Sequence, residues 1–243
     1  MFERLKKVFG AAATPAAPAP TLSRADSQQL LAWAQQRGYN FVEQPLRSHD
    51  GKSIGDGFVL DGTVQGKRWH LECGLPARDF VKGHELRARS ELGLLNSVAV
   101  VVMNRPLKVA LEKRAYDLYT DSLQTAVDSK LPDEMRWLAI YPEVGWLDMP
   151  ERFFDRYAIL SARREHASSW ITPELASKLL NWPSDLYSTG TPFMMMLMNG
   201  KCYLRMQYAN ADPAIVQHAV GLFCQASELA LERVAQAVNL DNT

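Results

Sequence analysis

The stretch that decides the fold is residues 193–208, FMMMLMNGKCYLRMQY, in which two strand-like runs flank Asn199-Gly200. The pair Asn-Gly strongly favours a tight β-hairpin turn, because both residues tolerate the positive φ angles that such a turn needs. The first run, 193–198, is apolar throughout, so its methionines would alternate between two buried sheet faces. We therefore expect an antiparallel hairpin whose first strand is covered on both sides.

A second hairpin is expected at residues 58–73, where the runs 58–64 and 68–73 flank Gln65-Gly66-Lys67. The second run alternates apolar and polar residues, which predicts one dry face and one solvated face. The dry face carries Trp69, Leu71 and Cys73, and the solvated face carries Arg68, His70 and Glu72. Cysteine at such a position usually acts as a small buried hydrophobic residue.

The other segments predict helices that pack on this sheet. Ser23 to Asp26 matches a capping box, Thr172-Pro173-Glu174 opens a helix, and Asp212-Pro213 begins the longest one. Further predicted elements are strands at 39–46, 97–103 and 135–141 and a helix at 105–127, whereas 153–160 fits either a strand or a helix. The sequence therefore predicts an α+β fold, with a mainly antiparallel sheet built from hairpins and amphipathic helices packed on it.

A short internal similarity raises the hypothesis of two similar halves. Gly66-Lys67-Arg68-Trp69 and Gly200-Lys201-Cys202-Tyr203 share a glycine, a lysine and an aromatic residue at the same spacing, each within a predicted hairpin. Only these three positions match. Chance similarity between two hairpins is therefore the alternative.

The first 20 residues differ in character from the rest of the chain. Residues 1–10 predict a short basic amphipathic helix, and the Ala/Pro-rich residues 11–20 predict a flexible linker that holds it away from the body. The predicted membrane or partner contacts are Phe2, Leu5, Lys6, Lys7, Val8 and Phe9. Membrane attachment, docking into a protein groove and a frayed start without function all stay open. Residues 21–243 are expected to form a single α+β globular domain.

Composition narrows the classes of function. The 243 residues carry 27 Lys and Arg against 27 Asp and Glu, and this zero net charge disfavours specific binding of nucleic acid. Three cysteines cannot all pair, and their spacing matches no four-cysteine zinc site, so neither a disulfide scaffold nor such a site is expected. A cytoplasmic location fits best, with peripheral attachment to the inner face of a membrane as an extension.

Three local motifs match parts of known signatures, and each is incomplete. Asp50-Gly51-Lys52-Ser53 lacks the earlier glycine of a phosphate-binding P-loop, since Leu46 stands at that position. His70-Leu71-Glu72 lacks the cysteine pair of a zinc deaminase, and His84-Glu85 lacks the second histidine of a zinc protease helix. The sequence therefore predicts no catalytic residue, no metal site and no cofactor.

Basic residues gather between positions 78 and 89. If this segment is extended, Arg87 and Arg89 share one face, and their forked donors suit a phosphate, a carboxylate or a lipid head group. Aromatic residues are concentrated in 137–187, where the turn-rich surroundings favour a surface position for one tryptophan. The predicted anion or ligand contacts are Arg78, Lys82, His84, Arg87, Arg89 and Trp146. A solvated edge whose bases pair with neighbouring acids is the alternative.

These observations favour a non-enzymatic cytoplasmic adaptor or assembly protein, tethered by residues 1–10 to an anionic membrane surface or to a protein partner. The alternative is an enzyme or a binder of a small anionic ligand, with its site near Arg87, Arg89 and the aromatic segment 137–187. Deleting residues 1–20 would disturb localisation under the first hypothesis and leave ligand affinity intact under the second. The sequence leaves open whether the chain forms a homo-oligomer.

Overall fold

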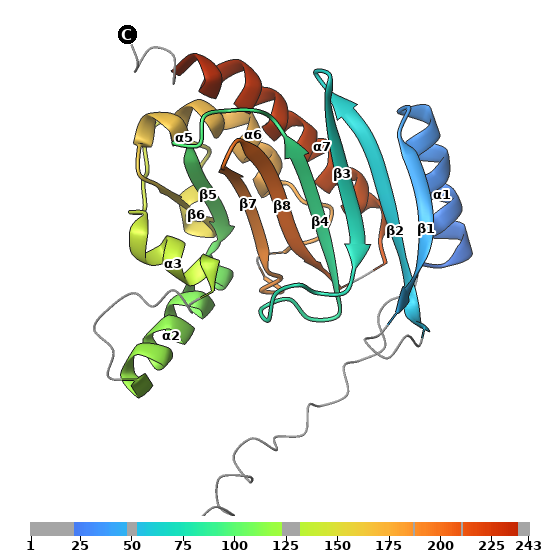
Figure 1. Ribbon diagram of the computed structural model, residues 1–243, viewed down its shortest axis with the longest axis horizontal. Coiled ribbons are helices and arrows are strands. Elements are labelled where there is room, and N and C mark those ends of the chain that lie inside the picture. The colour runs from blue at the N-terminus through green and yellow to red at the C-terminus, as the bar shows by residue number, and fades with distance from the viewer. Residues whose placement is uncertain (1–21, 48–52, 123–131, 187, 210, 238–243) are drawn as a thin grey trace, which may run out of the picture.

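The computed structural model describes residues 22–47, 53–122, 132–186, 188–209 and 211–237. Its central element is an 8-stranded sheet in the order β1-β2-β3-β4-β8-β7-β5-β6, in which every neighbouring pair is antiparallel (Figure 1). The strands are β1 (Asn40–Arg47), β2 (Ser53–Val64), β3 (Lys67–Gly74), β4 (His84–Glu91), β5 (Ala99–Asn104), β6 (Tyr157–Ser161), β7 (Phe193–Met198) and β8 (Lys201–Tyr208). The predicted α+β class with a mainly antiparallel sheet is confirmed.

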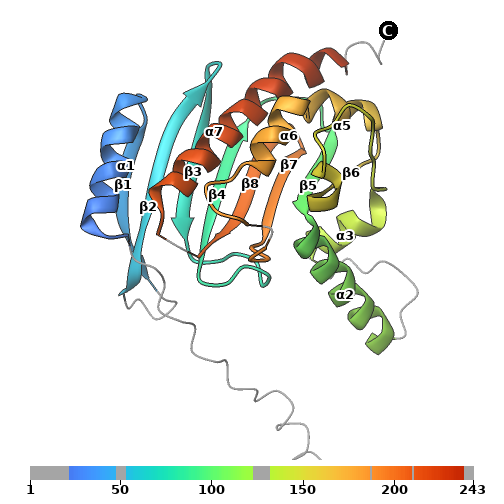
Figure 2. The same cartoon turned by 180° about the vertical axis from the view of Figure 1, so that it is seen from behind.

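Helices cover the two faces of the sheet unequally. α1, α5, α6 and α7 lie on one face (Figure 2), whereas α2 and α3 pack on the other face over β5, β6 and β7. The helices are α1 (Arg24–Gln36), α2 (Arg105–Ser122), α3 (Asp133–Ile140), α4 (Phe153–Arg156), α5 (Arg164–Trp170), α6 (Pro173–Leu180) and α7 (Pro213–Leu229), which continues into a π-helical turn (Ala230–Val234). One face therefore has described helices from end to end, and the other has them only at the β5–β6 end.

Local sequence signals set the starts of three helices. At α1, the Asp26 N–H donates to Ser23 Oγ at 3.1 Å, and the Asp26 carboxylate accepts in return from the Ser23 N–H. The side chains of Thr172 and Asp212 cap α6 and α7, each accepting a backbone N–H of the first turn. The three predicted helix starts are confirmed.

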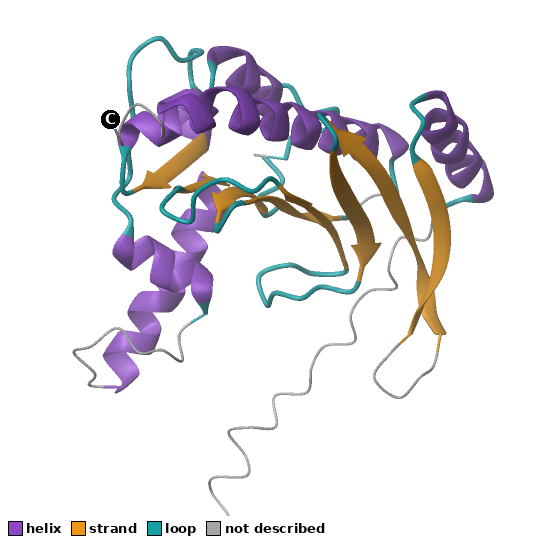
Figure 3. Cartoon of the chain, turned by 45° about the horizontal axis from the view of Figure 1, so that its top comes forward, coloured by secondary structure: helices purple, strands orange, loops and turns teal. Residues whose placement is uncertain are grey.

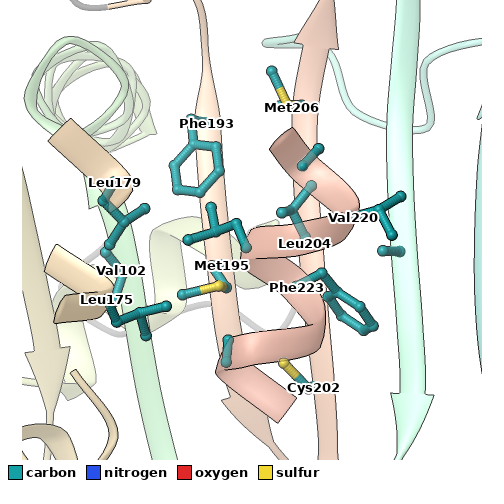
Figure 4. Packing of buried hydrophobic residues seen from close by; sticks show 14 of the residues in the cluster. Val102, Leu175, Leu179, Phe193, Met195, Cys202, Leu204, Met206, Val220 and Phe223 are labelled. Atoms are coloured by element: carbon teal, nitrogen blue, oxygen red, sulfur yellow. The ribbon is translucent and has the colours of Figure 1, made fainter. Parts of the chain in front are cut away.

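The main core lies between the sheet and the helices α6 and α7. This layer includes Phe223 of α7 and Leu204 of β8, and also Leu175 of α6 and Val102 of β5 (Figure 4). All four side chains have 0% exposure. Burial of one such side chain contributes about 1.5–3 kcal/mol, so this layer fixes the sheet against the helices.

The methionine-rich strand β7 contributes to both sides of the sheet. Met195 belongs to the main core, whereas Met194 and Met196 pack with Leu111 of α2 and Met135 of α3 in a second core. Successive side chains of a strand point to opposite faces, which explains this division. The prediction that these methionines fill two buried faces is confirmed.

Two predicted elements change in the structure. The strand predicted at 135–141 is wrong, because α3 spans Asp133–Ile140. Pro132 precedes this helix and two acids occupy its first turn, where they favour a helix, but a short apolar run does not distinguish helix from strand. The ambiguous segment 153–160 contains both elements, α4 and then β6, and the sequence patterns did not predict α5.

The two Gly-Lys hairpins do not occupy equivalent positions. Trp69 pairs in register with Ser90, and Ser90 pairs with Cys202, so Trp69 and Cys202 share one sheet face. Tyr203, the supposed counterpart of Trp69, therefore points to the opposite face. The three-position match does not mark a structural repeat.

Several predictions concern residues outside the described ranges. The basic helix at 1–10, with all of its predicted membrane or partner contacts, and the linker at 11–20 belong to this group. The predicted helix 105–127 corresponds to α2, which the structure describes as far as Ser122.

Candidate functional site

One face of β2, β3, β4 and β8 presents polar side chains and has no helix of the described chain over it (Figure 3). We call it the open face, and its central residues are Asp61, His70, Glu72, Glu85, Arg87, Arg89, Lys201, Tyr203 and Arg205. Strand alternation places these side chains opposite the buried Leu71, Ala88 and Leu204. The register of the open face continues into Met194 and Met196 of β7, where α2 and α3 cover the sheet. The open face is therefore the part of this surface that a ligand can reach.

A closed ion network occupies one half of the open face. Glu85 Oε1 accepts from Nη1 of Arg205 at 2.8 Å, and Glu85 Oε2 accepts from the Ala77 N–H at 2.7 Å. Nη1 of Arg87 lies 3.6 Å from Glu85 Oε2, and Nη2 of the same residue lies 2.7 Å from Glu72 Oε1. The Glu85 side chain has 0% exposure, so these partners compensate a buried charge. Two guanidinium groups balance two carboxylates, which leaves this half without net charge.

The other half of the open face forms one row across four strands. Asp61, His70, Arg89 and Tyr203 are successive register partners on β2, β3, β4 and β8. Nδ1 of His70 lies 2.8 Å from Oδ1 of Asp61, and both side chains are about half exposed. Arg89 is exposed and forms no ion pair or hydrogen bond with any side chain of the described chain. This guanidinium therefore has its full set of donors available to an incoming anion.

Further positive charge lies beside this row. Lys201 pairs with Glu91 at 2.8 Å, and the hydrogen bond to that carboxylate raises the pKa of Lys201. Arg68 is exposed on the same face, one step beyond His70 on β3. The three charges of Arg68, Arg89 and Lys201 exceed the two of Glu91 and Asp61, so this end of the open face carries a net positive charge that attracts anions.

A hollow of about 350 Å³ joins the two halves. Its lining consists of His70, Glu72, Arg87, Ala88, Arg89, Tyr203, Leu204 and Arg205. This volume lies at the lower end of the range for small-molecule sites, about 300–1,000 Å³. The hollow has room for one small anionic group, with guanidinium, imidazole and phenol donors around it.

The structure brings together only two of the residues predicted to contact an anion. Arg87 and Arg89 share the open face, as their alternation predicted. Arg78 instead binds the buried Glu134, and the Lys82 N–H donates to Gln207 at 2.9 Å. The hollow is therefore built around the two arginines of β4, with partners from other strands.

His84 and Trp146 lie away from the open face. His84 has 1% exposure on the core side of β4, because it lies three positions before Arg87 and an odd spacing along a strand reverses the side-chain direction. Trp146 is half-buried and packs edge-to-face on Phe154, with ring centroids 5.8 Å apart. Its predicted surface position is therefore only partly correct, since Trp146 packs against the main core.

Sequence patterns missed His70, Tyr203 and Arg205 as members of the site. The alternation in 68–73 correctly predicts a solvated strand face for His70, and the alternation in KCYLRMQY places Tyr203 and Arg205 on one face of β8. The missing information was that β8 pairs with β4. Nothing local in either strand specifies a partner more than 100 residues away.

The cysteines are not part of the open face. Burial raises the pKa of the Cys73 and Cys202 thiols to about 12, and it raises the pKa of Cys224 to about 11. These thiols are therefore protonated near neutral pH and poor nucleophiles. Within the described ranges, no group of three or more His, Cys, Asp or Glu residues is arranged to hold a metal ion.

The helix Pro213–Ala237 is long and apolar enough to cross a membrane, but half of its most apolar window is buried inside the fold. Core helices of soluble proteins pass the same test. In this structure the helix lies across the sheet (Figure 2). Comparison with protein-family models, with curated proteins and with solved structures gives no match.

Proposed function

We propose that the chain is a binding protein that holds an anionic group of a protein partner, a phosphate or a carboxylate, in the hollow of the open face. The observation that carries this proposal is the contrast between Arg89 and its neighbours. Arg87 forms an ion pair with Glu72, and Arg205 forms one with Glu85. Arg89 faces the hollow without an acidic partner in the described chain. An arginine in this state suits bidentate recognition of a phosphate or a carboxylate.

The shape around the hollow favours a narrow partner segment over a membrane surface. In Figure 3, α2 and the ends of β1 and β2 project on either side of the open face. A flat bilayer would meet these projections first, whereas a loop or a chain terminus could pass between them. We therefore assign membrane attachment to residues 1–10 rather than to the sheet.

The adaptor hypothesis combines the two surfaces. The open face would capture the anionic partner, and the basic segment 1–10 would provide the second contact, with a membrane or another protein. A cytoplasmic location belongs to the same proposal. Two weak contacts joined by a linker bind more tightly together than either does alone.

The test of the open face is a titration of the ¹⁵N-labelled full-length protein with inorganic phosphate and with a hexaglutamate peptide, followed by NMR. We expect chemical-shift changes centred on His70, Arg89 and Tyr203. Arg89→Gln should weaken binding about tenfold or more, because a charge-assisted hydrogen bond contributes about 1.5–3 kcal/mol. Arg164→Gln is the matched control, since Arg164 is an exposed arginine at the start of α5 in the helical layer. Equal binding by the two variants would refute the proposal.

A further inference from the structure

His70 lines the hollow beside Arg89, its register partner on β4. A carboxylate accepts hydrogen bonds and does not donate them, so the 2.8 Å contact with Asp61 Oδ1 places a proton on Nδ1 of His70. The other ring nitrogen, Nε2, has no partner in the described chain, and His70 lines the hollow. When the ring is neutral, Nε2 can only accept a hydrogen bond. When the ring is protonated, Nε2 donates one and the ring carries a positive charge.

Three donor side chains then surround the same space. His70, Arg89 and Tyr203 occupy successive positions on adjacent strands, which are about 4.8 Å apart. A phosphoryl group presents three terminal oxygens in a tetrahedral arrangement, whereas a carboxylate presents two oxygens in a plane. Three donors from three strands match the first geometry better. The charges of Arg89 and a protonated His70 also match a dianion.

Each carboxylate near His70 already has a partner, and the other charged side chains near it are arginines. On β2, Asp61 binds Nδ1 of His70 itself, and on its own strand Glu72 binds Arg87. The groups that face it across β4 and β8 are Arg87, Arg89, Tyr203 and Arg205, and Arg68 is exposed on β3. No carboxylate of the described chain stands between His70 and Arg89, which are direct register partners.

We infer that the hollow takes a phosphoryl group and that His70 binds it as the imidazolium, donating from Nε2. This inference rests on the proposed function and narrows its ligand class. The same chemistry fits a phosphorylated side chain of a partner and a free phosphate ester. Affinity for a dianion is then higher for the protonated than for the neutral His70 ring, because only the protonated ring donates a hydrogen bond from Nε2 and carries a positive charge.

The test uses sulfate as the probe, because sulfate is tetrahedral and keeps two negative charges between about pH 5.5 and about pH 8. Any change in its affinity over this range then comes from the protein. The full-length protein is titrated by NMR at both pH values and at constant ionic strength. We expect the affinity for sulfate to be higher by a factor of about ten or more at the lower pH. Acetate, a planar monoanion, should bind more weakly than sulfate at the lower pH.

Variants separate the role of His70 from other effects of pH. His70→Gln should bind sulfate weakly at both pH values, and His70→Lys, which is always charged, should bind it well at both. His218→Gln is the control and should keep the wild-type pH dependence, since His218 lies on α7 in the helical layer. A titration with a phosphoserine tripeptide and with inorganic phosphate identifies the source: tighter binding of the tripeptide indicates a phosphorylated partner, and equal binding indicates a free phosphate ester.

Three outcomes overturn the inference. They are equal sulfate affinity at the two pH values, an unchanged pH dependence in His70→Gln, and acetate binding as tight as sulfate binding. In each of these cases a loss of binding in Arg89→Gln still supports the proposed function. The proposed function is refuted as well if the protein binds none of these anions at either pH, or if Arg89→Gln does not weaken binding.

Discussion

The carboxylate of Glu85, which has no exposed surface, accepts a hydrogen bond of 2.8 Å from Nη1 of Arg205 on the neighbouring strand. Removing one partner of a buried pair leaves the other charge uncompensated, which costs about 3–5 kcal/mol. We expect Glu85→Ala to lower the free energy of unfolding by about 3 kcal/mol, measured by urea denaturation. Glu91→Gln breaks the more exposed pair with Lys201 and should cost less than about 1 kcal/mol. Equal effects of the two substitutions would contradict the structural role of Glu85.

Gly62 packs directly against an aromatic ring. A Cβ atom at this position would lie 2.4 Å from Cζ2 of Trp69 and 2.8 Å from Cδ1 of Tyr39. We expect Gly62→Ala to destabilise the fold by about 1–3 kcal/mol through overpacking, with a change in tryptophan fluorescence. Gly145→Ala is the control, because its Cβ would meet only ordinary contacts at 3.7 Å and beyond. A Gly62→Ala variant as stable as the control would show that this packing is loose.

His218 should make stability depend on pH. Burial lowers the pKa of its imidazole, the hydrogen bond to the Lys178 carbonyl opposes this effect, and the charge of Lys178 adds to it. Below about pH 6.5 the unfolded chain takes up this proton before the folded chain does, so folding loses stability as the pH falls toward the folded-state pKa. Urea midpoints at about pH 7.5 and about pH 5 should therefore differ less in His218→Gln than in the wild type. An identical difference in both proteins would exclude this contribution.

The three thiols should react slowly in the folded protein. Burial raises the pKa of Cys73 and Cys202 to about 12 and that of Cys224 to about 11, so little thiolate is present at mildly alkaline pH. We expect a thiol reagent to label Cys224 first, because it is half-buried whereas the other two are buried. Cys224→Ser should remove this first phase, and urea should make the remaining thiols react rapidly. Fast labelling of Cys202 in the native protein would contradict the packing of β8.

The N-terminal segment gives a prediction that is independent of the sheet. Full-length protein should sediment with anionic liposomes at low salt, and a protein that lacks residues 1–20 should stay in solution. Neutral liposomes are the control for the electrostatic part of the binding. Equal absence of binding by both proteins would remove the membrane hypothesis and leave protein docking or a frayed start without function.

The sequence predicted what depends on neighbours along the chain. The turn at Asn199-Gly200, the cap at Ser23 and the alternation that puts Arg87 beside Arg89 are all local, and each prediction is confirmed. The same local patterns left 153–160 undecided and assigned 135–141 to a strand, because short apolar runs fit both kinds of element. The sequence predicted only some residues of the candidate site, for a different reason. Tyr203 and Arg205 join it through strand pairing, and pairing depends on the packing of the whole sheet.

Pairing between β4 and β8 also has a consequence for synthesis of the protein. Glu85 and Arg205 are 120 residues apart, so on the ribosome β4 emerges about 6–24 seconds before its neighbour. During this interval its outer edge is unsatisfied and open to association with other chains. The hollow does not exist until β8 arrives, because Arg89 and Tyr203 come from the two strands. A nascent chain therefore cannot bind the proposed ligand, and only molecules that have completed the sheet could bind it and be stabilised by it.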